Sequence, residues 1–273
     1  MTVVAPPTLL GVPYDAASSF RCGAAAAPPA IRAALTSPAG NSWTEGLVDL
    51  GVAGTVVDAG DVSLPDAATA RTRIAAGVAA VLAAGGRPIV LGGDHSITYP
   101  VLRAVRPQHP HLSVLHIDAH PDLYDEFQGD RYSHACPFAR ALEERLLDEL
   151  VQVGIRTMNA AQRAQAERFG VDVIDMDAWV AGRRPSLAYP VYMSIDLDGL
   201  DPAYVPGVSH PEPGGLSVRE VVTLIHGLEV PLVGADVVEL NPELDSRGLT
   251  ALVAAKLVKE LAGRMLAQQP DDE

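Results

Sequence analysis

The sequence predicts an α/β fold of three layers (α/β/α), in which helices cover both faces of a central, mostly parallel sheet of eight strands. Short β-branched apolar runs alternate with longer segments rich in Ala and Leu, which is typical of strands joined by crossover helices. Several apolar runs show no polar alternation, as expected of strands buried on both faces. The chain has 273 residues, of which 48% are hydrophobic and 20% charged, so we expect a single domain over residues 1–273.

Eight apolar runs are the expected strands, and three of the segments between them carry helix signals. A helix over 67–84 should end at Gly85-Gly86, because glycine favours helix termination. Ser217-Val-Arg-Glu220 has capping-box spacing and should start a second helix, and 248–267 is typical of an amphipathic terminal helix. The expected strands are 8–12, 55–57, 88–91, 112–117, 150–153, 171–174, 191–195 and 232–238.

Charge and cysteine content exclude several classes of protein. The 20 Lys and Arg residues against 34 Asp and Glu residues give a formal net charge of −14. Nucleic-acid and anionic-membrane partners need clustered positive charge, so we expect neither. The two cysteines, Cys22 and Cys136, are too few for a disulfide framework, which indicates a reducing compartment. We also expect no signal or membrane-spanning segment, and therefore predict a cytoplasmic location.

Polar clusters follow four of the expected strands, at the strand ends where open α/β sheets bind their ligands. Gly92-Gly-Asp-His-Ser96 is the first, and by itself it favours a hydrogen-bonded structural His95 over a ligand. In the second, Asp118, His120 and Asp122 lie at spacing two, so an extended backbone would direct all three to one side. Two carboxylates and an imidazole that converge after a buried strand indicate a bound cation.

The third cluster adds two more carboxylates. Asp196 and Asp198 also lie at spacing two, whereas we interpret Asp201 as a turn cap. Two histidines and four aspartates are too many ligands for one ion and suit two ions bridged by carboxylates. Such oxygen-rich ligation favours a hard or borderline divalent ion such as Mn²⁺, with Fe²⁺, Co²⁺ or Zn²⁺ as alternatives.

The fourth cluster centres on Glu239, which follows the expected strand 232–238. Its carboxylate could pair with a planar cation such as a guanidinium group. It could equally be a structural carboxylate satisfied by loop amides, and both interpretations stay open at this point.

In this order and spacing, the four clusters resemble the arginase/agmatinase (ureohydrolase) family. The resemblance extends along nearly the whole chain, and the loop Pro206-Gly-Val-Ser-His-Pro-Glu-Pro213 is most similar to plant-type arginases and their bacterial relatives. The segments that carry it are Gly92-Gly-Asp-His-Ser96, Asp118-Ala-His-Pro-Asp122, Ser194-Ile-Asp-Leu-Asp-Gly-Leu-Asp-Pro202 and Glu239-Leu-Asn-Pro242.

The resemblance implies two Mn²⁺ ions per subunit and three catalytic residues. Asp122 would relay the proton of the water that the ions activate, Glu239 would orient the guanidinium, and His134 would contact substrate and deliver a proton to the leaving amine. The implied ligands of one ion are His95, Asp118, Asp122 and Asp196, and those of the other are Asp118, His120, Asp196 and Asp198.

The resemblance also implies a small cationic guanidino substrate, with L-arginine, hydrolysed to ornithine and urea, as the leading candidate. Agmatine, hydrolysed to putrescine and urea, or another guanidino acid is the alternative. Animal-type arginases place an Asp against the substrate α-amino group where this chain has Asn159, and an Asn near the α-carboxylate where it has Tyr124. We therefore expect Asn159, with His134 and Glu239, to contact the substrate.

Three further expectations follow. Formimidoylglutamate hydrolysis is less favoured, because the loop 206–213 resembles that of plant-type arginases. A non-catalytic metal-binding role is less favoured, because all six ligands are present together with Glu239 and His134. Family members assemble as homotrimers or homohexamers, so a homo-oligomer is expected. Cys136 has no basic neighbour in the sequence, and we interpret it as a packing residue.

Overall fold

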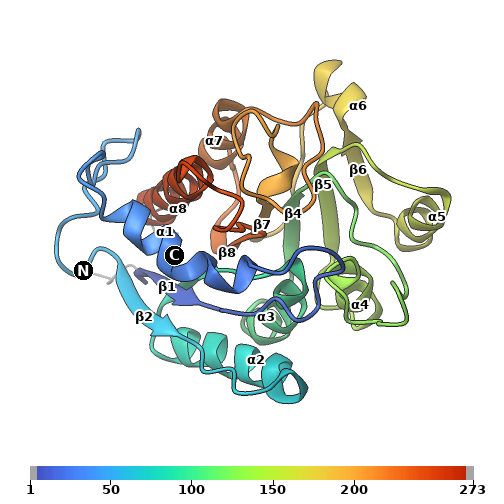
Figure 1. The fold of residues 1–273 in the computed structure, drawn as a ribbon, viewed down its shortest axis with the longest axis horizontal. Coiled ribbons are helices and arrows are strands. Elements are labelled where there is room, and N and C mark those ends of the chain that lie inside the picture. The colour runs from blue at the N-terminus through green and yellow to red at the C-terminus, as the bar shows by residue number, and fades with distance from the viewer. Residues whose placement is uncertain (1–4, 269–273) are drawn as a thin grey trace.

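The computed structural model describes residues 5–268, and within them eight strands form one sheet in the order β2-β1-β3-β8-β7-β4-β5-β6 (Figure 1). Every pair of neighbouring strands is parallel. The predicted α/β class with a central eight-stranded sheet is therefore confirmed. The strands are β1 Pro7–Gly11, β2 Val57–Asp61, β3 Arg87–Leu91, β4 Ser113–Ile117, β5 Glu149–Ile155, β6 Asp172–Asp175, β7 Val191–Asp196 and β8 Leu232–Val238.

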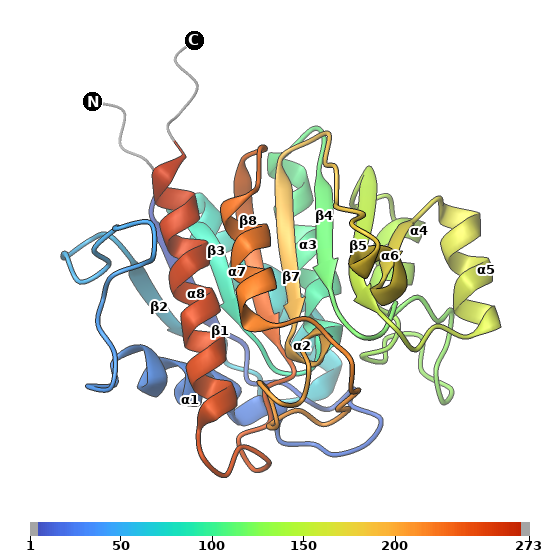
Figure 2. The ribbon, with the colours of Figure 1, turned by 90° about the horizontal axis from the view of Figure 1, so that it is seen from above.

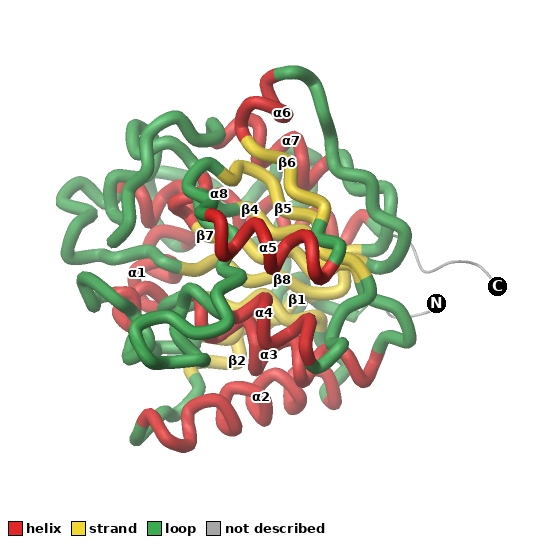
Figure 3. The backbone as a smooth tube through the Cα atoms, turned by 90° about the vertical axis from the view of Figure 1, so that its right-hand side faces the viewer, coloured by secondary structure: helices red, strands yellow, loops and turns green. Residues whose placement is uncertain are grey.

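Helices cover both faces of this sheet, as Figure 3 shows by the red tubes on either side of the yellow strands. Helices α1, α7 and α8 pack together on one face, and α2, α3 and α4 on the other. Buried apolar side chains accordingly form two clusters, one on each side. The helices are α1 Ala27–Leu35, α2 Ala67–Ala83, α3 Thr98–Val105, α4 Pro137–Glu143, α5 Ala160–Phe169, α6 Met176–Val180, α7 Val218–His226 and α8 Leu249–Ala267.

The three helices expected from sequence signals are confirmed to within one residue at the ends that those signals defined. Asp66 caps the N-terminus of α2 by accepting a hydrogen bond from the Thr69 N–H. At α7 the predicted capping box is present, because the Ser217 side chain accepts from the Glu220 N–H while Glu220 accepts from the Ser217 N–H. Helix α8 follows Gly248.

The second strand and five helices differ from the prediction. The apolar run 55–57 overlaps β2 only at Val57, since the ladder with β1 extends through a polar stretch to Asp61. This edge strand is exposed, and Arg32 of α1 pairs with both Asp58 and Asp61, so its pattern is not that of a buried strand. Helices α1 and α3 to α6 are short and were not predicted.

The sheet order brings the four polar clusters together. Strands β3, β8, β7 and β4 are successive neighbours, and because they are parallel their carboxyl ends lie at one edge of the sheet. Figure 2 shows the loops that follow β1, β7 and β8 along this edge, at the bottom of the view. Within residues 5–268 none of the helices has the length and apolar character that crossing a bilayer requires.

Candidate metal centre and active site

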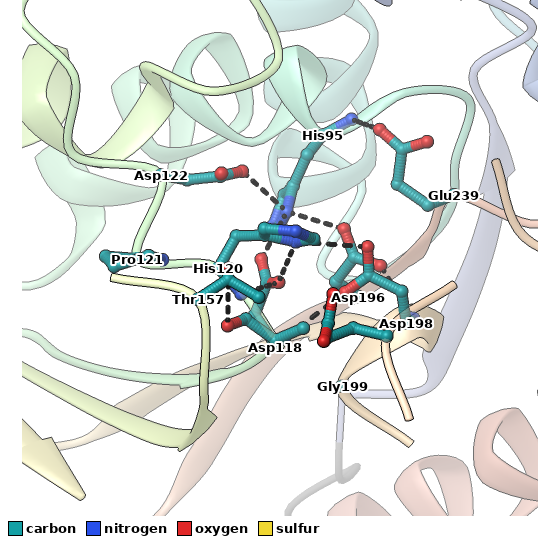
Figure 4. A network of polar contacts seen from close by, with 12 residues as sticks. His95, Asp118, His120, Pro121, Asp122, Thr157, Asp196, Asp198, Gly199 and Glu239 are labelled. Carbon is teal, nitrogen blue, oxygen red and sulfur yellow. Dashed lines mark hydrogen bonds and ion pairs between the residues drawn. The ribbon is translucent and has the colours of Figure 1, made fainter. Parts of the chain in front are cut away.

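His95 lies at the centre of the predicted cluster, facing three carboxylates (Figure 4). Its Nδ1 atom is 3.2 Å from Oδ2 of Asp118, 3.2 Å from Oδ2 of Asp122 and 3.0 Å from Oδ2 of Asp196. The ring is fully buried, yet Nδ1 has no hydrogen-bond partner among residues 5–268. An orphaned ring nitrogen among three carboxylate oxygens is the arrangement that a metal ion would satisfy.

A second group of donors lies beside the first. His120 Nδ1 is 3.3 Å from Oδ1 of Asp118 and 3.2 Å from Oδ2 of Asp198. Asp118 therefore directs one carboxylate oxygen to each histidine. The structure thus brings together all six residues predicted to bind metal, in two adjoining groups that share Asp118.

The protonation of these groups shows how strongly the cluster needs positive charge. Burial and the neighbouring Asp118 raise the pKa of Asp198 to about 7. Burial, followed by Asp198 and Asp118, raises the pKa of Asp196 well above its usual value. Although burial disfavours its charge, Asp198 and Asp118 raise the pKa of His120 to about 12. Two divalent cations would neutralise the same carboxylates, so this donor set fits the dinuclear metal centre that the sequence predicts.

Backbone geometry at the strand ends fixes these side chains. At Gly93 a Cβ atom would lie 1.6 Å from the carbonyl oxygen of Tyr14, so only glycine allows the turn that leads into His95. Asp122 and Glu239 have φ angles of 50° and 67°, a left-handed conformation that costs about 1 to 2 kcal/mol for an ordinary residue. Strained backbone at two candidate functional residues is typical of a site whose geometry the surrounding fold imposes.

Glu239 and His134 form a second pair at the cavity. The Glu239 Oε1 atom accepts a hydrogen bond of 2.9 Å from the His95 N–H and lies 3.4 Å from His134 Nδ1. On the other side of its ring, His134 Nε2 lies 2.8 Å from the Ser19 hydroxyl. Burial by itself would lower the pKa of His134, but the neighbouring Glu239 raises this pKa to about 9. Glu239 is thus partly satisfied by a backbone amide, while for its Oε2 we find no hydrogen bond within residues 5–268.

Four of the six donors, His120, Asp122, Asp196 and Asp198, line one cavity of about 200 Å³ together with His134 and Glu239. Seven of its lining residues had no predicted contact role, and they are Ser19, Tyr124, Phe127, Ala135, Thr157, Gln162 and His210. No Lys or Arg side chain from the described part of the chain is among them.

The predicted substrate contact Asn159 does not line this cavity. Its Oδ1 atom caps α5 by accepting from the Gln162 N–H at 3.0 Å, and its Nδ2 donates to the Tyr124 hydroxyl at 2.6 Å. Both ends of the amide are therefore occupied, and Gln162 and Tyr124 face the cavity instead. The family pattern suggested a substrate contact at position 159 but could not show that the Asn159 amide caps α5.

His210 and Ser19 reach the cavity from distant loops. The His210 ring stacks on that of His134 at 5.0 Å between centroids. His210 lies in the loop whose similarity to plant-type arginases was noted from sequence, which is the only signal that could have identified it. Ser19 lies in a segment, 18–23, that also resembles the family, but only the fold shows that its hydroxyl reaches His134.

Comparisons with known proteins agree with this geometry. The model of the "Arginase family" matches residues 5–263. The mitochondrial arginase 1 of Arabidopsis thaliana is 47% identical over 94% of this chain and 80% of its own length. The proclavaminate amidinohydrolase of Streptomyces clavuligerus is 38% identical over 93% of this chain and 86% of its own. The solved arginase from Medicago truncatula superposes with a TM-score of 0.90 at 43% identity, covering 97% of this chain and 89% of that one.

These comparisons contradict the predicted cytoplasmic location. The plant relatives from Arabidopsis thaliana, Oryza sativa and Medicago truncatula are named mitochondrial or chloroplastic/mitochondrial. A low cysteine count does not distinguish between the compartments that keep thiols reduced. A search for apolar runs also overlooks organellar targeting peptides, which are amphipathic rather than apolar.

Proposed function

Because the chain belongs to the arginase family, we propose that it hydrolyses L-arginine to ornithine and urea. The chain is a hydrolase of the arginase type that acts on amidines, as its relatives do. The identity of 43% to 47% with plant arginases supports arginine, because the amidinohydrolase and guanidinopropionase relatives are 38% and 39% identical.

We propose two Mn²⁺ ions as the resident metal. His95, Asp118, Asp122 and Asp196 would hold one ion, and Asp118, His120, Asp196 and Asp198 the other. The orphaned Nδ1 atom of His95 is the observation that carries this assignment. When bound, two divalent cations lower the pKa of water enough to provide a nucleophile near neutral pH.

The chain's own residues then bind the guanidinium and move protons. Glu239 presents a buried carboxylate to the cavity, which suits a paired hydrogen bond to a planar guanidinium. Asp122 accepts the proton that the attacking water loses. His134, which Glu239 keeps protonated near neutral pH, donates a proton to the departing amine nitrogen. Asn159 supports the cavity wall by holding Tyr124.

Agmatine is the second candidate, and one observation favours it. A substrate α-carboxylate usually meets a cation, yet neither Lys nor Arg lines the cavity within the described residues. Urea release from arginine, agmatine and guanidino acids, with and without added Mn²⁺, discriminates between them. The proposal predicts Mn²⁺-dependent urea release with the highest kcat/KM for arginine. Release of formamide from formimidoylglutamate, or no product from any guanidino compound, contradicts it.

We also propose one domain over residues 1–273 and a homotrimer or homohexamer, with neither nucleic-acid nor membrane partners. The family match over 5–263 and the single sheet support one domain. A single cooperative unfolding transition and a mass of three or six chains of 28.6 kDa, measured by light scattering, would agree with both.

A further inference from the structure

His95 offers two ring nitrogens, and their surroundings differ completely. Nδ1 faces the carboxylates of Asp118, Asp122 and Asp196, whereas Nε2 lies 2.9 Å from the Ser194 hydroxyl. A nitrogen that binds a metal must present a lone pair, so the other nitrogen must carry the proton. The group that receives this second N–H therefore decides how well His95 serves as a ligand.

A buried carboxylate lies directly behind Ser194. Asp236 of β8 is fully buried and accepts hydrogen bonds from three hydroxyls. Ser194 Oγ donates to its Oδ1 at 2.7 Å, and Thr98 Oγ1 and Tyr192 OH each donate to its Oδ2 at 2.9 Å. Ser194 is the register partner of Asp236 in the β7–β8 ladder, and Tyr192 lies two residues earlier on the same face.

The three hydroxyls indicate which way the protons point. A hydroxyl has one proton, and within residues 5–268 neither Thr98 nor Tyr192 has another hydrogen-bond acceptor for its side chain. If Ser194 gives its proton to Asp236, it can only accept on the side of His95. The proton of His95 then lies on Nε2, and the Nδ1 lone pair points at the carboxylate cluster.

We propose that Asp236, acting through Ser194, is a positioning residue that orients the His95 ring and reserves its Nδ1 for a metal ion. This inference rests on the proposed dinuclear centre and extends it by two residues that do not touch the ions. It concerns one of the two ions only, because within residues 5–268 Asp236 accepts hydrogen bonds from Ser194, Thr98 and Tyr192, and of these only Ser194 contacts a predicted ligand, His95.

The chain of hydrogen bonds from Asp236 through Ser194 to His95, called the relay below, can be tested by measuring metal affinity instead of enzyme activity. Ser194→Ala removes the acceptor for Nε2–H, and Asp236→Leu keeps the branching at Cγ but removes the carboxylate. Each should weaken Mn²⁺ binding at one of two sites by about 10- to 100-fold, the usual range for groups that orient a metal ligand. Asp236→Asn keeps an acceptor oxygen and should lose less than about 10-fold. Calorimetric titration of the metal-free protein resolves the two sites.

A spectroscopic measurement distinguishes an effect on the relay from a general disturbance of packing. The chain has eight histidines, so ¹⁵N-histidine labelling of the diamagnetic Zn²⁺-loaded protein gives a tractable spectrum. Wild type should show a protected His95 Nε2–H resonance that is lost in Ser194→Ala and Asp236→Leu. Thr98→Val is the matched control, because it deletes a hydroxyl on the same carboxylate but leaves Ser194 and His95 paired, and it should keep both the resonance and the affinity.

The outcomes distinguish a failure of the proposed metal centre from a failure of the proposed Asp236–Ser194–His95 hydrogen-bond chain. If wild type binds no divalent metal, the proposed function fails. If wild type binds two ions and Ser194→Ala binds them equally well, only the relay is wrong. Equal losses in Thr98→Val and Asp236→Leu would also refute it, since general packing would then explain both. Should Asp236→Leu fail to fold, Ser194→Ala and Asp236→Asn decide the question.

Discussion

Replacing Asp198 with asparagine should stabilise the metal-free protein while weakening its metal centre. The carboxylates of Asp118, Asp196 and Asp198 are all buried within one small cluster. Without cations they repel one another, and the pKa of Asp198 rises to about 7 from 3.8 because of burial and Asp118. Asparagine has nearly the same shape and no charge, so the substitution removes the repulsion without opening a cavity.

The size of the effect follows from the pKa. A carboxyl group whose pKa is higher in the folded than in the unfolded protein destabilises the fold above its unfolded pKa, and the full loss is present above its folded pKa. Between pH 5 and the folded pKa near 7, this corresponds to about 3 kcal/mol for one group. The advantage of metal-free Asp198→Asn over wild type should therefore be about 3 kcal/mol larger at pH 8 than at pH 5.

Denaturant unfolding in the presence of a chelator, followed by the fluorescence of the buried Trp179, measures this difference. Asp201→Asn is the control, because Asp201 lies in the same segment, but hydrogen bonds from the Ala203 and Gly214 amides lower its pKa. This substitution also removes one negative charge, but its effect on the free energy of unfolding relative to wild type should not grow between pH 5 and pH 8. With Mn²⁺ at about 1,000 times its Kd, the free energy of unfolding of wild type should rise by about 4 kcal/mol per ion. Wild type should then be more stable than Asp198→Asn. An advantage of Asp198→Asn that is absent at pH 8, or equal at both pH values, would show that the cluster is not under electrostatic strain.

Three further predictions concern single side chains. Asp122→Asn should fold, because asparagine tolerates the left-handed backbone at this position, and kcat should fall by about 10²- to 10⁴-fold; unchanged kcat in a protein that binds metal would remove Asp122 from the mechanism. Glu239→Gln should lower kcat/KM for guanidino substrates by about 30-fold through loss of about 2 kcal/mol of charge-assisted hydrogen bonding, and equal kinetics in the two proteins would contradict the proposed guanidinium contact. Cys136 is buried, and burial raises the pKa of its thiol to about 12, whereas Cys22 is exposed; iodoacetamide should therefore modify the native protein once and the unfolded protein twice, as mass spectrometry would record.

The convergence of the four aspartates could be predicted because their positions depend on local rules. Alternate residues of a strand share a face, and parallel strands end at one edge, so Asp118, Asp122, Asp196 and Asp198 were expected to converge. Spacing alone did not identify His95 as a ligand, because a single histidine after a strand is usually structural. The family resemblance implied a ligand role for His95, and the structure adds that three carboxylates surround its Nδ1 atom.

The parts that could not be predicted depend on long-range packing. Nothing near Ser19 indicates that its loop would contact His134, 115 residues away. At Asn159 the family pattern predicted a substrate contact, whereas in the structure the side-chain amide caps helix α5. The edge strand β2 was misplaced for a similar reason, because its polar residues are stabilised by Arg32 rather than by burial.

The position of β8 between β3 and β7 also limits which strand pairs can form while the chain is being synthesised. β3 ends at residue 91 and β7 at residue 196, but the strand that joins them begins only at residue 232. Until β8 has been synthesised, β3 and β7 each have an open edge that can pair with another chain and promote aggregation. His95 and Asp196 also cannot meet before that strand inserts, so metal uptake would report one of the last steps of folding and would distinguish finished chains from nascent ones.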